Sequence, residues 1–305
     1  MSLGSCFAEN IAEKFDYYKF ENAVNPFGII FNTVSIERII ERIVNQEVFT
    51  EKDIFFHNEL WHCFEVHSQF SNPNKDKFLA NLNEKLAFYY YKIMELSHCI
   101  ITFGTSWVYR NIESNQIVAN CHKMPQKQFS KELLSIENTQ KSIENIISLI
   151  HSINKDVKFI FTVSPVRHIK DGFVENNVSK SILLQSVYNV VNSNTGVPPL
   201  GVRGHFPSYE IIHDELRDYR FYKEDMIHPN QVAINYVWIK FSENYISENE
   251  FATMQEVCDI QKSLHHKPLN ENSKIHQKFL LDLKQKINTF AEKFPNIKFK
   301  NDTTI

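Results

Sequence analysis

The sequence has 305 residues, of which 43% are hydrophobic and 13% aromatic, and its formal net charge is −3. This length is enough for one large domain or for one domain with an appendage, and the aromatic content is typical of a filled core rather than of a disordered chain. The slightly acidic balance argues against a nucleic-acid partner. The lack of a long apolar run argues against a transmembrane helix or a membrane partner.

Hydrophobic periodicity predicts helices that alternate with strands. The predicted helices span residues 7–20, 34–46, 75–97, 130–152, 179–193 and 230–245, and a helical extension spans 250–295. Continuous apolar runs predict buried strands over 99–103 and 157–163, and residues 196–210 are expected to form a loop and then a strand. This alternation indicates a parallel, doubly wound α/β sheet. We expect a main domain over residues 1–245 and a helical extension, packed on or beside it, over 246–305.

Five cysteines are scattered along the chain, at positions 6, 63, 99, 121 and 258. An odd number without a spacing pattern does not suggest a disulfide framework and is typical of a reducing compartment, so we expect a cytoplasmic protein. The first residues lack a basic stretch followed by an apolar segment, so no signal peptide is expected. Residues 1–3 are too short for a full strand, and we expect that strand to begin upstream of them.

Ser5 precedes the first predicted helix, in the string Gly4-Ser5-Cys6. The N–H groups at a helix N-terminus attract negative charge, so a hydroxyl at this position suits attack on a carbonyl and stabilisation of the resulting oxyanion. The alternative is a serine that caps the helix. Cys6 is a rival nucleophile, although we favour its interpretation as a small buried apolar residue.

Asp225 lies three residues before His228, so both side chains can face the same way on one helical turn. An aspartate in this position fixes the tautomer of the imidazole and stabilises the imidazolium, as in a catalytic triad. Pro229 then begins the last helix of the main domain. The alternative is an ordinary turn with a histidine on the surface.

Two further polar clusters follow predicted strands, where loops often carry function. They contain His122 in one case and Arg167 and His168 in the other, which are candidates for substrate binding. The alternative is that each is a satisfied loop group. A metal-dependent hydrolase that uses His122 and His168 is also conceivable, but no pair shows the spacing of a zinc site, so we expect neither a metal nor a cofactor.

Seven short strings together resemble the GSCFA domain family, which is similar to SGNH/GDSL-like hydrolases. The resemblance covers residues 4 to about 240. The strings are Gly4-Ser5-Cys6-Phe7-Ala8, Asn25-Pro26-Phe27-Gly28, Gly104-Thr105-Ser106-Trp107-Val108-Tyr109, Asn120-Cys121-His122-Lys123, Ser164-Pro165-Val166-Arg167-His168, Phe206-Pro207-Ser208-Tyr209-Glu210 and Asp225-Met226-Ile227-His228-Pro229.

The resemblance implies a three-layer α/β/α sandwich with a mostly parallel sheet, in which Ser5, Asp225 and His228 are catalytic. It implies that the N–H group of Gly28 serves the oxyanion hole. The asparagine that usually completes this hole is missing at position 106, so Ser106 and Asn120 are further candidate donors.

The implied activity is that of a serine esterase that acts through an acyl-enzyme, and by analogy the substrate is an O-acetyl group of a carbohydrate. A small-molecule or glycan ester is thus the expected partner. An O-acyltransferase with the same triad and a non-catalytic carbohydrate-binding module are the alternatives. The sequence leaves the oligomeric state open.

Overall fold

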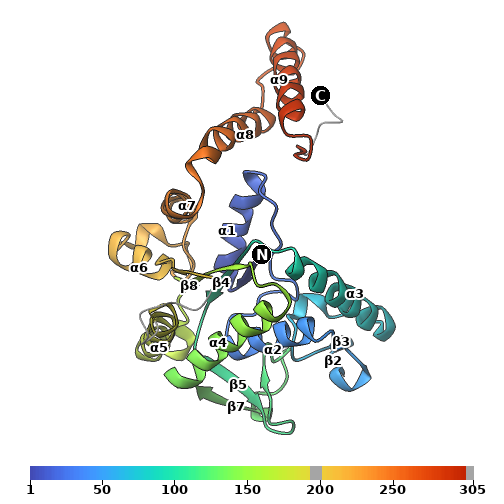
Figure 1. Ribbon diagram of the computed structural model, residues 1–305, viewed down its shortest axis with the longest axis vertical. Coiled ribbons are helices and arrows are strands. Elements are labelled where there is room, and N and C mark those ends of the chain that lie inside the picture. The colour runs from blue at the N-terminus through green and yellow to red at the C-terminus, as the bar shows by residue number, and fades with distance from the viewer. Residues whose placement is uncertain (193–200, 300–305) are drawn as a thin grey trace. The chain divides into compact units, whose positions relative to one another are not determined.

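The computed structural model describes residues 1–192 and 201–299, which fall into two compact units (Figure 1). Unit 1 comprises Met1–Ala12 and Ala23–Val237, and unit 2 comprises Glu13–Asn22 and Trp238–Ile305. The start of the loop predicted at 196–210 and the last six positions of the predicted extension lie outside the described residues.

The centre of unit 1 is a parallel sheet of four strands, in the order β1 (Ser2–Gly4), β4 (His98–Phe103), β8 (Lys158–Val163) and β9 (Val202–His205). Leu3 pairs with Ile101, and Phe103 pairs with Val163. Because the strands are parallel, their carboxyl ends meet at one edge of the sheet. This arrangement confirms the predicted parallel α/β sheet, and β9 confirms the strand expected in 196–210.

The side chains of the sheet alternate between its two faces. On one face, residues such as Ile101 and Phe161 join the core formed with α2 (Thr33–Val44), α3 (Lys75–Met94), α4 (Ile136–Ile153) and α5 (Phe173–Val191). Helix α4 packs against both α2 and α5.

The opposite face carries Thr162, whose Oγ1 lies 2.6 Å from Oγ of Ser208 in α6 (Ser208–Glu210). Helix α1 (Cys6–Tyr17) also begins on this face, opposite α2 and α4 (Figure 1). Helices therefore flank both faces of the sheet, as expected for a three-layer sandwich.

The helix predicted over 130–152 is wrong at its start, because the first residues form a strand. Strand β7 (Phe129–Leu133) pairs antiparallel with β5 (Trp107–Asn111), which also pairs with β6 (Ile117–Val118). Helix α4 begins only after Ser135, whose Oγ accepts a hydrogen bond from the N–H of Asn138 at 3.2 Å. The capping serine favours the start of a helix at this point, directly after the end of β7.

A small hairpin occupies the region 50–74, where the sequence pattern is mixed. It consists of β2 (Phe55–His57) and β3 (Leu60–His62). The two turn residues, Asn58 and Glu59, both have positive φ, of 45° and 64°, as a type I′ turn requires.

Unit 2 is helical, with α8 (Phe251–Leu264) and α9 (Lys274–Lys293) packed around a small apolar core that includes Ile260 and Phe290. The end of α1 contributes Tyr17, whose carbonyl accepts a hydrogen bond from Gln261 at 3.1 Å. Helix α7 (Gln231–Tyr245) lies in this unit from Trp238 onward. Among the described residues, no helix combines the length and apolar character needed to cross a lipid bilayer.

Candidate active site

Ser5 lies at the junction of β1 and α1, at the carboxyl edge of the sheet. Its N–H donates to the carbonyl of Thr102 at 3.1 Å, and its Oγ accepts a hydrogen bond from the N–H of Phe7 at 3.2 Å. The residue is 3% exposed. Ser5 therefore caps α1, which is the alternative role considered above, and it also occupies the helix N-terminus that a nucleophile would use.

Glycine is required immediately before Ser5. Gly4 has a φ of +123°, and a Cβ atom there would lie 2.0 Å from the carbonyl oxygen of Thr102. The side chain of Asn25 holds this turn, because its Oδ1 accepts a hydrogen bond from the N–H of Gly4 at 2.9 Å. These contacts fix the direction in which the Ser5 side chain leaves the backbone.

Asp225 and His228 form a hydrogen-bonded pair, with Oδ2 of Asp225 2.6 Å from Nδ1 of His228. The other carboxylate oxygen accepts hydrogen bonds from the N–H groups of His228 and Ile227, at 3.0 and 2.9 Å. These two N–H groups and the imidazole hold the pKa of Asp225 well below its usual range, with the N–H of His228 as the largest cause. An imidazole that donates from Nδ1 to a carboxylate leaves Nε2 free to accept a proton.

Arg167 holds the loop that carries this pair. Its Nη1 donates to the carbonyl of Met226 at 3.1 Å, and its own N–H donates to the carbonyl of Ile227 at 3.3 Å. The guanidinium also lies between 5.6 and 5.8 Å from the ring centroids of three aromatic side chains, Phe173, Tyr219 and Tyr222. The structure thus places Arg167 against the backbone beside the Asp225–His228 pair.

Electrostatic interactions link the two halves of the site. The pKa of the Cys6 thiol is raised chiefly by burial, while the ammonium groups of Lys180 and Lys223 act in the opposite direction. The N–H of Lys223 donates to the carbonyl of His228 at 2.7 Å. Because Cys6 follows Ser5 directly, both charges act near the proposed nucleophile. Lys223 also contacts the backbone of the proposed base, His228. A raised thiol pKa also favours Ser5 over Cys6 as the nucleophile.

His168 lies close to His228 and Lys180. Burial lowers the pKa of His168 to about 4, and the charges of Lys180 and His228 act in the same direction. Its ring packs on Phe31, at 5.3 Å between centroids, and its Nε2 is buried without a partner among the residues that the structure describes. His168 is therefore a neutral imidazole in the wall of the site.

The candidate oxyanion donors Gly28 and Ser106 are engaged elsewhere. The N–H of Gly28 donates to the carbonyl of Asn25 at 2.8 Å. Ser106 is fully buried, and its Oγ donates to the carbonyl of Ser179 in α5 at 3.0 Å. Either group would have to break this hydrogen bond before it could stabilise an oxyanion.

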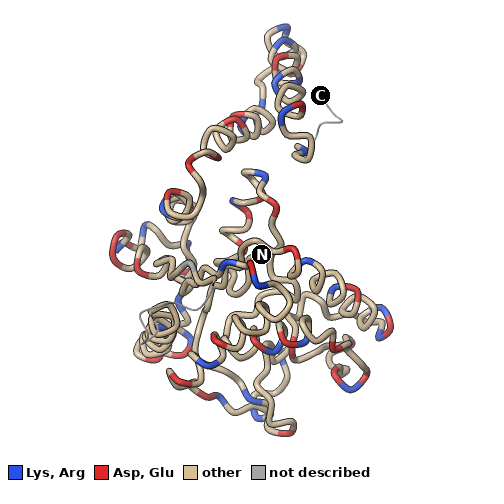
Figure 2. Tube along the Cα trace, in the orientation of Figure 1, with Lys and Arg blue, Asp and Glu red and all other residues tan. Residues whose placement is uncertain are grey.

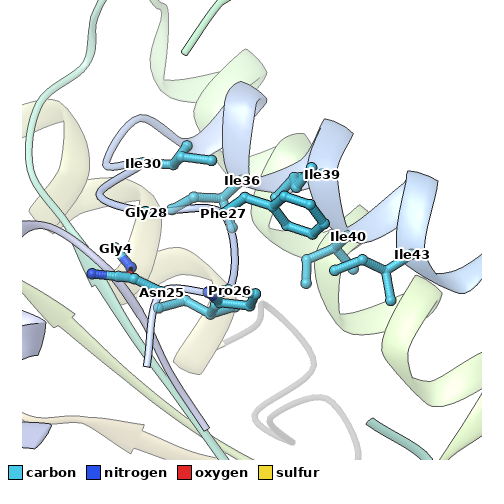
Figure 3. Close-up of a pocket in the computed structure, with 11 residues that line it drawn as sticks. Gly4, Asn25, Pro26, Phe27, Gly28, Ile30, Ile36, Ile39, Ile40 and Ile43 are labelled. Carbon is cyan, nitrogen blue, oxygen red and sulfur yellow. Dashed lines mark hydrogen bonds between the residues drawn. The ribbon is translucent and has the colours of Figure 1, made fainter. Parts of the chain in front are cut away.

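A small apolar pocket lies below the Gly28 turn, between the turn and α2 (Figure 3). Asn25, Pro26 and Phe27 contribute to its lining, and isoleucine side chains of α2 complete it, namely Ile36, Ile39, Ile40 and Ile43. Such a lining belongs to the core and offers few groups that would orient a polar substrate.

Asn120 and His122 belong to a different environment, next to the β2–β3 hairpin. Oδ1 of Asn120 accepts a hydrogen bond from the N–H of His122 at 2.8 Å. Nε2 of His122 lies 2.6 Å from the carbonyl oxygen of Cys63, and its ring lies 4.7 Å from that of His62. Burial lowers the pKa of His122 to about 4. Over the described parts of the chain, no hydrogen bond connects this cluster to Ser5 or His228.

Sequence comparison then identifies the family. The sequence model of the GSCFA family matches residues 1–241, which is most of the chain. The chain belongs to the GSCFA family. A second family model, for the C-terminal domain of GSCFA domain proteins, matches residues 257–304. No match was found among curated proteins or among solved structures.

The GSCFA chain shows no cluster of three or more His, Cys, Asp or Glu side chains suited to a metal ion within residues 1–192 and 201–299. His122 and His168, the two residues of the metal-dependent alternative, have separate sets of neighbours, as described above. Acidic and basic residues are interleaved along the trace of the described parts of the chain (Figure 2).

Lys180 is a residue of the GSCFA site that the sequence reasoning missed. It is 1% exposed, and its Nζ donates to the carbonyl oxygens of Gly104 and Ser164, at 2.6 and 2.7 Å. One signal was available in the sequence, because Lys180 falls on the same helical stripe as Leu183 and Val187, both of which are buried. A lysine on an apolar stripe is seldom buried without a specific partner.

Proposed function

We propose that this GSCFA protein is a serine hydrolase that cleaves an ester by way of an acyl-enzyme on Ser5. The observation that carries the proposal is the Asp225–His228 hydrogen bond of 2.6 Å, which leaves Nε2 of His228 available as a base. The position of Ser5 at a helix N-terminus on the carboxyl edge of the sheet adds to it, because ligands of parallel α/β sheets bind at that edge.

In the first half of the proposed reaction, Oγ of Ser5 attacks the carbonyl carbon of the ester while Nε2 of His228 takes its proton. The carboxylate of Asp225 stabilises the imidazolium. The tetrahedral intermediate then collapses, the alcohol leaves with the proton from His228, and the acyl group stays on Ser5. For this step the Oγ of Ser5 has to leave its hydrogen bond with the N–H of Phe7.

In the second half, Nε2 of His228 takes a proton from water while the water oxygen attacks the acyl carbon. The second tetrahedral intermediate collapses, His228 returns the proton to Oγ of Ser5, and the acid is released. If a second alcohol replaced water, the same residues would perform acyl transfer. The proposed substrate class is an O-acetylated carbohydrate. This class rests on analogy with similar hydrolases rather than on the geometry of the site.

A second candidate function is a non-catalytic binding module on the same fold. It is favoured by the capping role of Ser5, whose hydroxyl forms no hydrogen bond with His228 among the described residues, and by the engaged N–H of Gly28. Under this alternative the Asp225–His228 pair would stabilise its loop without reacting.

Hydrolysis of an activated acetate ester by the wild-type protein, Ser5→Ala and Cys6→Ala distinguishes these functions. We expect loss of nearly all turnover, by a factor of about 10³ or more, in Ser5→Ala alone, because the nucleophile is removed. Cys6→Ala is the matched control and should retain turnover. Equal rates in all three proteins would contradict the proposal and favour the binding module.

A further inference from the structure

Lys180 is a fully buried cation without an acidic partner. Within the described residues no carboxylate forms an ion pair with it, and its two hydrogen bonds go to the carbonyl oxygens of Gly104 and Ser164. A buried charge without a counter-ion is costly, and such groups are common at functional sites. The buried ammonium of Lys180 therefore indicates a function that an apolar side chain at this position could not perform.

The position of Lys180 follows from the register of the sheet. Gly104 comes directly after β4 and Ser164 directly after β8, so the ammonium lies across the carboxyl ends of two neighbouring strands. Ser5 comes directly after β1, which pairs with β4. The N–H of Ser5 donates a hydrogen bond to the carbonyl of Thr102 in β4. Since neighbouring strands are about 4.8 Å apart, the ammonium lies within roughly 10 Å of Ser5.

The titratable groups around Lys180 come from four elements. They are Cys6 of α1, His168 after β8, Tyr209 of α6 and His213 of the following helical turn, Ile211–Glu215. Burial has the largest effect on all three pKa values: it raises that of the Cys6 thiol and lowers those of the two histidines. The positive charge of Lys180 acts to lower all three, including that of the residue next to Ser5.

We propose that Lys180 is a positioning residue of the active site. Its ammonium holds together the turns after β4 and β8 and puts a positive charge beside the Ser5–Cys6 corner, where negative charge develops in the tetrahedral intermediate. A fixed charge in a buried site needs no reorganisation when the oxyanion forms, which is why such charges stabilise transition states strongly. The catalytic part rests on the proposed function, whereas the electrostatic part can be tested without it.

The reactivity of the Cys6 thiol measures the effect of this charge. Burial lowers the pKa of Lys180 to about 7, so its ammonium is charged at pH 6 and largely neutral at pH 9. The proposal predicts that N-ethylmaleimide modifies Cys6 several-fold more slowly in Lys180→Met than in the wild type at pH 6, and at nearly equal rates at pH 9. Peptide mapping by mass spectrometry gives the rate for each cysteine, and Cys258 in unit 2 is the control. Equal Cys6 rates at pH 6 would overturn the proposal.

Two further measurements keep the test decisive. If Lys180→Met does not fold, the rate of Cys6 modification in the wild type is measured from pH 5 to pH 10. A plot of the logarithm of this rate against pH that shows the titration of the thiol alone, with no second inflection, would overturn the proposal. If the wild type hydrolyses an acetate ester, Lys180→Met should lower kcat more at pH 6 than at pH 9 with little change in KM. An inactive wild type would contradict the proposed function, yet the thiol measurement would still decide the role of Lys180.

Discussion

At the scale of single residues, the direction of the Ser5 side chain depends on Gly4. The turn at Gly4 combines a positive φ with a close approach to the backbone of Thr102, where a Cβ atom would overlap the carbonyl oxygen, so any side chain would meet both strain and overlap. The strand cannot move away, because Leu3 and Gly4 are paired with β4. A serine held this firmly is suited to catalysis, in which small displacements of a nucleophile are costly.

We therefore expect Gly4→Ala to lower the free energy of unfolding by about 3 kcal/mol or more, since backbone strain and steric overlap add. Gly204→Ala is the matched control, because Gly204 has nearly the same φ, +125°, but no atom within 4 Å of a Cβ there. Urea unfolding measures both. Equal losses in the two variants would contradict the steric part of the argument.

The buried Lys180 predicts a second effect, on the pH dependence of stability. The pKa of Lys180 is about 7 in the folded protein, whereas the ordinary value of 10.5 applies to the unfolded chain. Between these two pH values the unfolded chain therefore binds more protons than the folded protein. The contribution of Lys180 to the free energy of unfolding should then rise with pH by up to about 1.4 kcal/mol per unit from pH 7 to pH 10. The difference between wild type and Lys180→Met, from urea unfolding at pH 6, 7.5 and 9, measures it. A constant difference would show that Lys180 does not titrate in this range.

Residue patterns predicted some of the site and missed the rest for physical reasons. The spacing of Asp225 and His228 is a local property, so their contact followed from the sequence. The partners of Lys180 are carbonyl groups at the ends of two strands, and they become visible only when the sheet is assembled. The hydrogen bonds that engage Gly28 and Ser106 also depend on the folded chain, so the catalytic roles assigned to these residues stay predictions.

At the scale of elements, the end of α2 is fixed by a buried arginine. Arg42 is 1% exposed, and its guanidinium donates to both oxygens of Glu65, at 2.7 and 2.8 Å, and to Asp53 at 3.0 Å. It also lies 4.3 Å from the ring centroid of Phe49. These contacts fasten α2 to the chain around the β2–β3 hairpin.

Arg42→Met should lower the free energy of unfolding by about 3 kcal/mol, because it removes the buried cation that pairs with Asp53 and makes the two shorter contacts with Glu65. Arg38→Met on the same helix is the control. Arg38 also contacts Glu65, at 3.4 Å, but its side chain is 35% exposed, so its loss should cost at most about 1 kcal/mol. Thermal or urea unfolding compares them, and similar losses would indicate that burial of Arg42 adds nothing.

The elements themselves were predictable where the pattern is long and regular. Strands β4 and β8 and helices α2 and α3 lie close to their expected positions, because each carries a continuous or strongly periodic apolar pattern. Helix α5 was predicted to begin at residue 179 but begins at Phe173. The short strands β2, β3 and β7 were missed. Each has five residues or fewer, and they are stabilised by pairing with other segments, which a local pattern does not reveal.

At the scale of the whole molecule, two long helices belong to both compact units. Helix α1 begins in unit 1 with Cys6 and ends in unit 2 with Tyr17, and α7 crosses the boundary at Val237. The boundary predicted at residue 245 lies inside the second unit, while the GSCFA family match ends at 241 and the C-terminal match begins at 257. The helix that follows the proposed nucleophile thus continues into the smaller unit.

In the proposed function, Ser5 is a nucleophile activated by His228 and Asp225. The most direct measurement treats the wild-type protein with a fluorophosphonate, which forms a stable bond with an activated serine, and locates the adduct by mass spectrometry. We expect one adduct, on Ser5, that forms at least about 100-fold more slowly in His228→Ala, because the base is lost. If Ser5 stays unmodified, or if its adduct forms at the same rate in His228→Ala, Ser5 is not a nucleophile activated by His228.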